Sequence, residues 1–209
     1  MERRAPDDAA AAELSAAAPP FVWPNGAFFW PIAFTVVMLD LVTKAIAAYA
    51  LVPEHIPHPV VGETVRLTLV YNPGAAFGIH VGDYSRVVFS VLTLAALGIL
   101  WRLFRGTRRG DRTRVLALAL VSAGAVGNLI DRLRSSRGVV DFIDIGSRDW
   151  RWPTFNVADI AVTTGAVLLA VVLWREDRES ARQIPASVPS DAPPSEDVRP
   201  VLVEHGGTV

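Results

Sequence analysis

The sequence predicts an all-α membrane protein: four transmembrane helices with a small β-containing loop region on the outer side of the membrane. Hydrophobic residues make up 51% of the 209-residue chain and the mean hydropathy is +0.34, which is too apolar for an ordinary soluble domain. The apolar residues gather in four stretches, and arginines lie at the ends of these stretches. This distribution is typical of a chain that is solvated by lipid and oriented by charge, and it does not indicate nucleic-acid binding.

Each apolar stretch has about 20 residues, enough to cross a hydrocarbon core of roughly 30 Å as a helix. The predicted helices span residues 28–51, 85–104, 113–133 and 155–174. Together they form a predicted catalytic domain over 28–174. The flanking segments 1–27 and 175–209 are polar or rich in Ala, Pro and Ser, so they are expected to be disordered tails.

Positive charge predicts the orientation of the helices. The densest basic cluster lies between the second and third helices, and by the positive-inside rule this connection is cytoplasmic. Both tails are then cytoplasmic as well, and residues 52–84 and 134–154 lie outside. Four arginines of the second outer loop run against this rule. The arginines of the inner cluster are Arg102, Arg105, Arg108, Arg109, Arg112 and Arg114, and those of the outer loop are Arg134, Arg137, Arg148 and Arg151.

The first stretch has a second interpretation as a cleaved secretory signal, because it ends in the small residues AIAAYA. The apolar run is longer than a typical signal core and contains Asp40 and Lys44, which favours a retained helix. In the following loop, the β-branched segment 64–70 predicts a short strand that ends in an Asn72-Pro73-Gly74 turn. The next residues, AAFGI, are expected to dip back towards the membrane.

Several ionisable residues lie within or at the ends of the predicted transmembrane helices. Asp40 and Lys44 are four residues apart, on one face of the first helix. A charge at the bilayer centre costs about 2.5 to 3.5 kcal/mol even on a lenient scale, so such residues are functional candidates. For this pair alone, an ion pair that only stabilises the helix bundle is an equal alternative.

Further polar residues converge at the outer end of the third and fourth helices. The third helix ends in GNLIDRL and the fourth begins in FNVADIAV, while VVDFID lies between them. Several carboxylates and two amides therefore meet at one place, namely Asn128, Asp131, Arg132, Asp141, Asp144, Asn156 and Asp159.

Two carboxylates close together in a low-dielectric pocket share one proton. One can then activate water while the protonated partner polarises a carbonyl group, which is the chemistry of an aspartic protease. The residues alone do not decide whether Asp131, Asp141 or Asp144 belongs to the pair.

Other chemistries fit less well. The chain has no cysteine, its histidines lie outside the apolar stretches, and neither HExxH nor GxSxG occurs. No serine lies close enough in sequence to make a dyad with Lys44. His55 and His58 form only a weak HxxH pair, so no metal and no cofactor are predicted.

Five motifs in this order resemble the lipoprotein signal peptidases, also called signal peptidase II: DLVTK, YNPGAAF, GNLIDR, VVDFID and FNVAD. The resemblance covers about residues 28 to 174. It implies that Asp141 and Asp159 are the catalytic pair. It also implies that Asp131 and Arg132 hold the site, as a carboxylate–guanidinium pair, and that Asp40 and Lys44 brace the first helix.

The resemblance assigns supporting roles to three amides and to the first outer loop. Asn72, Asn128 and Asn156 would bind the substrate backbone or orient the aspartates. The residues that would line the entrance are Gly74, Ala75, Ala76 and Phe77. For each supporting residue, buried polar packing is the alternative role.

The activity that the resemblance implies is removal of the signal peptide from bacterial prolipoproteins. Cleavage would occur immediately before a cysteine that carries diacylglycerol. The protein is then expected in the inner (cytoplasmic) membrane as a monomer, with its active site near the outer face and with membrane lipid and the lipidated prolipoprotein as its partners.

Two rival functions remain open at this stage. A small proton- or ion-coupled transporter also needs intramembrane carboxylates, but it predicts an internal repeat, which the sequence does not display. A non-catalytic assembly factor would use the same polar residues to hold helices together.

Overall fold

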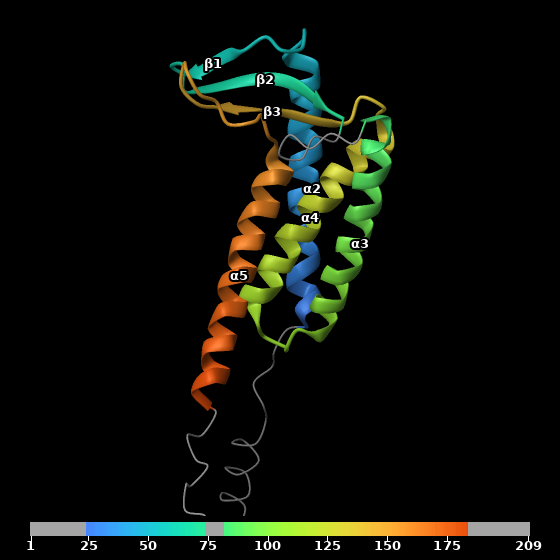
Figure 1. Ribbon diagram of the computed structural model, residues 1–209. Helices are drawn as coiled ribbons and strands as arrows, with labels where there is room; N and C mark the ends of the chain where they lie inside the picture. The colour runs from blue at the N-terminus through green and yellow to red at the C-terminus, as the bar shows by residue number, and fades with distance from the viewer. Residues whose placement is uncertain (1–23, 74–81, 184–209) are drawn as a thin grey trace, which may run out of the picture.

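The computed structural model describes residues 24–73 and 82–183. This part of the chain folds into a bundle of four long helices with a small antiparallel sheet across one end (Figure 1). The helices are α2 (Asn25–Ala50), α3 (Ser85–Gly106), α4 (Arg112–Arg134) and α5 (Val157–Gln183), and a short 3-10 turn, η1 (Gly82–Tyr84), precedes α3. The strands are β1 (His58–Val61), β2 (Val65–Asn72) and β3 (Val139–Ile145).

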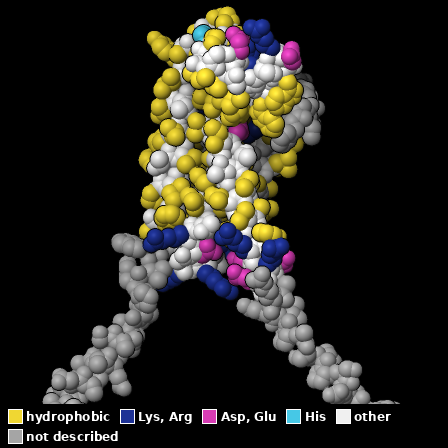
Figure 2. Space-filling view, turned by 90° about the vertical axis from the view of Figure 1, so that its left-hand side faces the viewer, with side chains coloured by type: hydrophobic (Ala, Val, Ile, Leu, Met, Phe, Trp, Pro, Cys, Tyr) yellow, Lys and Arg dark blue, Asp and Glu magenta, His cyan; other side chains and the backbone are white. Residues whose placement is uncertain are grey.

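All four helices are long and apolar enough to cross a membrane. Their outward faces carry large apolar side chains, such as Phe34, Ile46, Ile99 and Val167. These side chains form a wide apolar belt around the bundle, and arginines and acidic residues rim the end opposite the sheet (Figure 2). The fold class predicted from the sequence is confirmed.

The helix bounds differ from the prediction mainly at the ends. α2 starts three residues earlier than expected, and α5 continues past Trp174 to Gln183, into the segment predicted as a tail. α4 begins at Arg112 because Asp111 caps it, accepting a hydrogen bond from the Arg114 backbone N–H at 3.0 Å. The remaining residues of both predicted tails, 1–23 and 184–209, lie outside the described part of the chain.

The sheet has the order β1-β2-β3, with both neighbouring pairs antiparallel. β2 confirms the strand predicted over 64–70. The segment VVDFID, expected only as a short outer segment, is strand β3, because its backbone pairs with β2 from Val139 opposite Asn72 to Ile145 opposite Val65.

α4 is the central helix of the bundle and has the largest buried share of any of the four. It packs against α2, α3 and α5. Its contact with α5 is close at Gly124, where a Cβ atom would overlap the backbone oxygen of Ala158. The small residue thus allows the backbones of the two helices to approach, as in other membrane helix pairs.

The start of α5 is tied to the sheet. The Phe155 backbone exchanges hydrogen bonds with Ile143 of β3, at 2.8 Å and 3.0 Å. Asn156 follows Phe155 directly and Asp159 lies in the first turn of α5. This pairing therefore places the two polar residues of FNVAD beside Asp141 of β3.

Candidate active site

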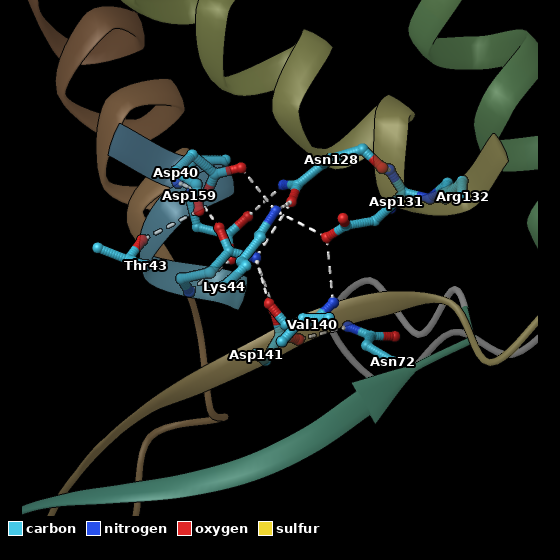
Figure 3. Close-up of polar contacts among 12 residues, drawn as sticks. Asp40, Thr43, Lys44, Asn72, Asn128, Asp131, Arg132, Val140, Asp141 and Asp159 are labelled. Atoms are coloured by element: carbon cyan, nitrogen blue, oxygen red, sulfur yellow. Dashed lines mark hydrogen bonds and ion pairs between the residues drawn. The ribbon is translucent and has the colours of Figure 1, made fainter. Parts of the chain in front are cut away.

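The polar residues singled out in the sequence meet where α2, α4 and α5 approach β3 (Figure 3). α2 contributes Asp40 and Lys44, and α4 contributes Asn128 and Asp131. β3 contributes Asp141 from the side of the sheet. Asp40 and Asn156 are fully buried, and Lys44 and Asp141 are each 3% exposed. The site is thus a polar cluster enclosed by apolar helices.

Lys44 is the central cation of the cluster. Its Nζ atom lies 2.8 Å from Asp40 Oδ2 and 2.9 Å from Asp131 Oδ2, and it donates a hydrogen bond to Asn128 Oδ1 at 2.9 Å. The contact with Asp40 Oδ2 is an ion pair rather than a hydrogen bond, because this oxygen has no hydrogen-bond partner within the described residues. The predicted Asp40–Lys44 pair is therefore present, and it extends to α4.

Two asparagines connect this cation to the carboxylates of the predicted pair. Asn128 Nδ2 donates to Asp159 Oδ1 at 2.8 Å. Asn156 Nδ2 donates to Asp141 Oδ1 at 2.7 Å and to Asn128 Oδ1 at 3.1 Å. Asn156 also caps α5: its Oδ1 accepts from the Asp159 N–H at 3.0 Å, and its own N–H donates to Asp159 Oδ2 at 3.1 Å. Asn156 thus contacts both Asp141 and Asp159.

Asp141 makes no ion pair within the described residues, and Lys44 acts on its charge only from a distance. Its Oδ1 accepts from Asn156, and its Oδ2 accepts from Asn72 Nδ2 at 3.2 Å. Burial, followed by the negative charge of Asp159, raises the pKa of the Asp141 carboxyl to about 7. The group can therefore hold a proton at neutral pH.

The two other candidate carboxylates are compensated by cations. Asp131 is paired with Lys44 and also accepts the Val140 N–H at 3.2 Å. Asp144 accepts from Arg151 Nε at 2.5 Å, from Arg66 Nε at 3.1 Å and from Thr68 at 3.0 Å. Burial acts to raise the pKa of Asp144, but these hydrogen bonds hold it below its usual value.

One expected contact is absent. The sequence suggested an Asp131–Arg132 ion pair, but Asp131 is paired with Lys44, so this expectation was wrong. The two neighbours project from different sides of α4, as successive helical residues do. Arg132 instead donates to the Asn128 backbone oxygen at 3.4 Å and lies over the Phe89 ring at 5.8 Å. Its Nε atom has no partner within the described residues.

The first outer loop is only partly described. Asn72 ends β2 and contacts Asp141, as a residue that orients the aspartates would. The predicted entrance residues Gly74, Ala75, Ala76 and Phe77 lie outside the described residues.

Two features of the site went unnoticed in the sequence. Asp40 Oδ1 accepts a hydrogen bond from the Ala158 backbone N–H at 2.9 Å, which ties α2 to the start of α5. Gly127 makes room for Asp40, since a Cβ atom there would overlap Asp40 Oδ2. The signal for Gly127 was its position directly before Asn128 in GNLIDR, but only the packing of α2 on α4 reveals its role.

Comparisons with known proteins identify the family of this chain. The sequence model of the Peptidase A8 family, described as signal peptidase (SPase) II, matches residues 32–175. The chain belongs to the signal peptidase II family. It is therefore a multi-pass membrane peptidase of the aspartic type.

Individual relatives show the same family. The lipoprotein signal peptidase of Mycobacterium avium is 42% identical over 146 residues, which cover 68% of this chain and 75% of that protein. The lipoprotein signal peptidase of Desulforapulum autotrophicum is 43% identical over 141 residues, covering 66% and 85%. A solved bacterial membrane enzyme superposes with a TM-score of 0.64 at 32% identity, covering 75% of this chain and 92% of the other.

Family membership also decides between the rival functions. Membership of a peptidase family does not support the function of a transporter. It also argues against a non-catalytic assembly factor, because the family consists of enzymes. The resemblance read from the five motifs is confirmed at the level of the family.

Proposed function

We propose that this chain, as a member of the signal peptidase II family, removes the signal peptide from prolipoproteins with Asp141 and Asp159 as its catalytic pair. The observation that carries the assignment is the distribution of charge in the site. Asp40 and Asp131 share the cation of Lys44, and Asp144 is held by two arginines. Asp141 and Asp159 have only N–H donors of amides as hydrogen-bond partners within the described residues.

Two carboxylates that make no ion pair within the described residues, and that are both held by one asparagine, fit the electronic requirement of the reaction. When they share one proton, the ionised group takes a proton from water, and the water oxygen attacks the scissile carbonyl carbon. The protonated group donates its proton towards the carbonyl oxygen, where negative charge develops. Collapse of the tetrahedral intermediate then breaks the C–N bond, and a proton passes to the leaving amine.

The substrate that fits this position is a signal helix followed by a lipid-modified cysteine. The outward faces of all four helices are apolar, so a hydrophobic signal peptide and acyl chains can approach from the lipid itself. The scissile bond would lie immediately before the diacylglyceryl cysteine.

The proposed substrate is tested with purified full-length protein in detergent. A prolipoprotein that carries diacylglycerol on its cysteine should be cut before that cysteine, as measured by mass spectrometry of both products. The matched substrate without the lipid should be cut at least about a hundredfold more slowly, because remote binding energy contributes to the chemical step. Equal cleavage of both substrates, or cleavage at another bond, would contradict the proposed specificity.

We also propose that the sheet and the active site lie on the outer side of the membrane, with both termini in the cytoplasm. The exposed arginines of the α3–α4 connection support this orientation by the positive-inside rule. Four arginines of the second outer loop run against this rule. Two of them are paired with acidic residues, Arg151 with Asp144 and Arg137 with Glu54, so their charges count less against the proposed orientation.

The orientation can be measured by labelling, because the natural chain has no cysteine. Asp149→Cys, on an exposed turn beside the sheet, should react with a membrane-impermeant maleimide in intact cells. Arg109→Cys, exposed between α3 and α4, should react only after the membrane is permeabilised. The reverse pattern would show that the orientation is inverted.

A further inference from the structure

We infer that Lys44 is a positioning residue that acts through Asn128: it fixes the orientation of the Asn128 amide and thereby holds Asp159 as the ionised base, so that the shared proton resides on Asp141. This inference rests on the proposed catalytic pair. It adds which carboxylate activates water and names the groups that make the choice.

The first step is the orientation of the Asn128 side chain. Lys44 donates to Asn128 Oδ1 at 2.9 Å, and Asn156 Nδ2 donates to the same oxygen at 3.1 Å. Both neighbours are donors at this point, and an ammonium group has no acceptor. If the amide were turned over, its NH₂ group would face two donors. Only the orientation with the oxygen towards Lys44 is therefore satisfied.

This orientation fixes what Asp159 meets. The NH₂ group of Asn128 must point away from Lys44, and it donates to Asp159 Oδ1 at 2.8 Å. Asp159 Oδ2 is occupied by the Asn156 backbone N–H at 3.1 Å. A proton on either oxygen would have to compete with one of these donors. Both oxygens of Asp159 thus accept N–H donors, which suits a carboxylate that acts only as an acceptor.

The helix adds to the preference. Asp159 is the acidic residue in the first turn of α5, where the helix dipole favours negative charge. Asp141 lies on strand β3 and has no such field. One of its two amide donors, Asn156 Nδ2, is shared with Asn128 Oδ1 and with the Val140 oxygen at 3.3 Å. The proton that the two carboxylates share therefore resides on Asp141.

Lys44 exerts this effect through contact rather than through uncompensated charge. Two carboxylates, Asp40 and Asp131, already neutralise it, and they hold its Nζ atom from α2 and from α4. Figure 3 shows the amine of Lys44 among Asp40, Asn128 and Asp131. The charged and titratable groups around the pair are Asp40 and Lys44 of α2, Asp131 and Arg132 of α4, Asp141 of β3 and Asp159 of α5.

The test is the pH dependence of kcat with the lipidated prolipoprotein and purified full-length variants. Lys44→Met removes the donor that orients Asn128. Asn128→Asp keeps an oxygen for Lys44 but withdraws the N–H group from Asp159. In both variants the acidic limb of the profile should move to higher pH by about one unit or more, equivalent to about a tenfold loss on that limb. KM should change by less than about threefold, because the groups act on the chemical step.

Two further variants separate positioning from stability. Lys44→Arg keeps a donor and should restore part of the acidic limb. Arg66→Met removes a cation from the Asp144 ion pair on the sheet, away from Asp159. It should lower the thermal stability but leave the acidic limb of the folded fraction where the wild type has it. If Lys44→Met does not fold, the shift in Asn128→Leu, which withdraws the N–H group from Asp159 without adding a charge, decides the matter.

The inference would be overturned if the folded variants lost kcat by the same factor at every pH, with the acidic limb unmoved. Lys44 would then be only a structural brace. Failure of the proposed function looks different: in that case the wild-type protein itself does not cut the lipidated substrate, or Asp159→Asn cuts it normally.

Discussion

Replacing Asp141 or Asp159 by Asn is expected to lower kcat for cleavage of a lipidated prolipoprotein by about a thousandfold or more, a loss typical of removing a key catalytic group. An asparagine nearly matches the size of the carboxyl group and keeps part of its hydrogen bonding. It can neither accept a proton from water nor give one to a carbonyl oxygen. The measurement is single-turnover cleavage by purified variants, with thermal unfolding as the check on folding.

The matched control for this pair is Asp144→Asn, in the same strand as Asp141. Asp144 is equally buried but is committed to Arg66 and Arg151. Its replacement should lower stability, because two arginines lose their partner, while the folded fraction keeps activity within about tenfold of the wild type. If Asp141→Asn kept normal activity and Asp144→Asn lost it, the catalytic carboxylate of VVDFID would be Asp144 and not Asp141.

Gly127→Ala is expected to destabilise the protein by about 1–3 kcal/mol, the usual cost of adding a methyl group to a packed interior. The new Cβ atom would overlap Asp40 Oδ2, and it would lie 3.4 Å from the Ala158 Cβ atom. Asp40 cannot move freely, because Lys44 and the Ala158 N–H both hold it. Cleavage activity should fall together with stability, since the same contacts hold α2 against the site.

Gly98→Ala provides the control for this substitution. Gly98 is in the middle of α3, and a Cβ atom there would meet nothing within 4 Å. We expect its melting temperature in detergent to equal or slightly exceed that of the wild type, as for a helical glycine replaced by alanine without a clash. Equal melting temperatures for both variants would contradict the close packing of Asp40 on Gly127.

The four helices could be predicted because each apolar stretch is long enough to cross the membrane as a helix. Strand β2 was also predictable, since its residues are β-branched. Strand β3 was not predicted, although five of its seven residues are Val, Ile or Phe, because its two aspartates are unfavourable in strands. Its conformation depends on partners far along the chain: β2 supplies the ladder, and Arg66 and Arg151 neutralise Asp144.

The members of the site could be predicted, but their connections could not. The periodicity of a helix places Asp40 beside Lys44, and it places Asn156 near Asp159. It does not reveal that Lys44 takes Asp131 as its second partner, or that Arg132 makes no ion pair within the described residues. These pairings arise from the rotation of α2 against α4, which is set by side-chain packing across the bundle rather than by either segment alone.

The residues alone also left Asp131, Asp141 and Asp144 as equal candidates for the pair. The structure separates them by the cations that each one contacts. Charge compensation of this kind depends on three elements at once, so a single segment cannot disclose it. The motif resemblance named Asp141, and the absence of an ion pair to Asp141 within the described residues gives that choice a physical reason.

The central claim is that Asp141 and Asp159 work as a pair with one proton, and the pH dependence of kcat/KM for the wild-type protein tests it most directly. Because burial raises the pKa of Asp141 to about 7, this carboxyl group keeps its proton below that pH and loses it as the pH rises. We therefore predict a bell-shaped profile whose basic limb falls through about pH 7, as the pair becomes doubly ionised. A rate that stays constant or rises between about pH 7 and 9 would contradict a shared proton.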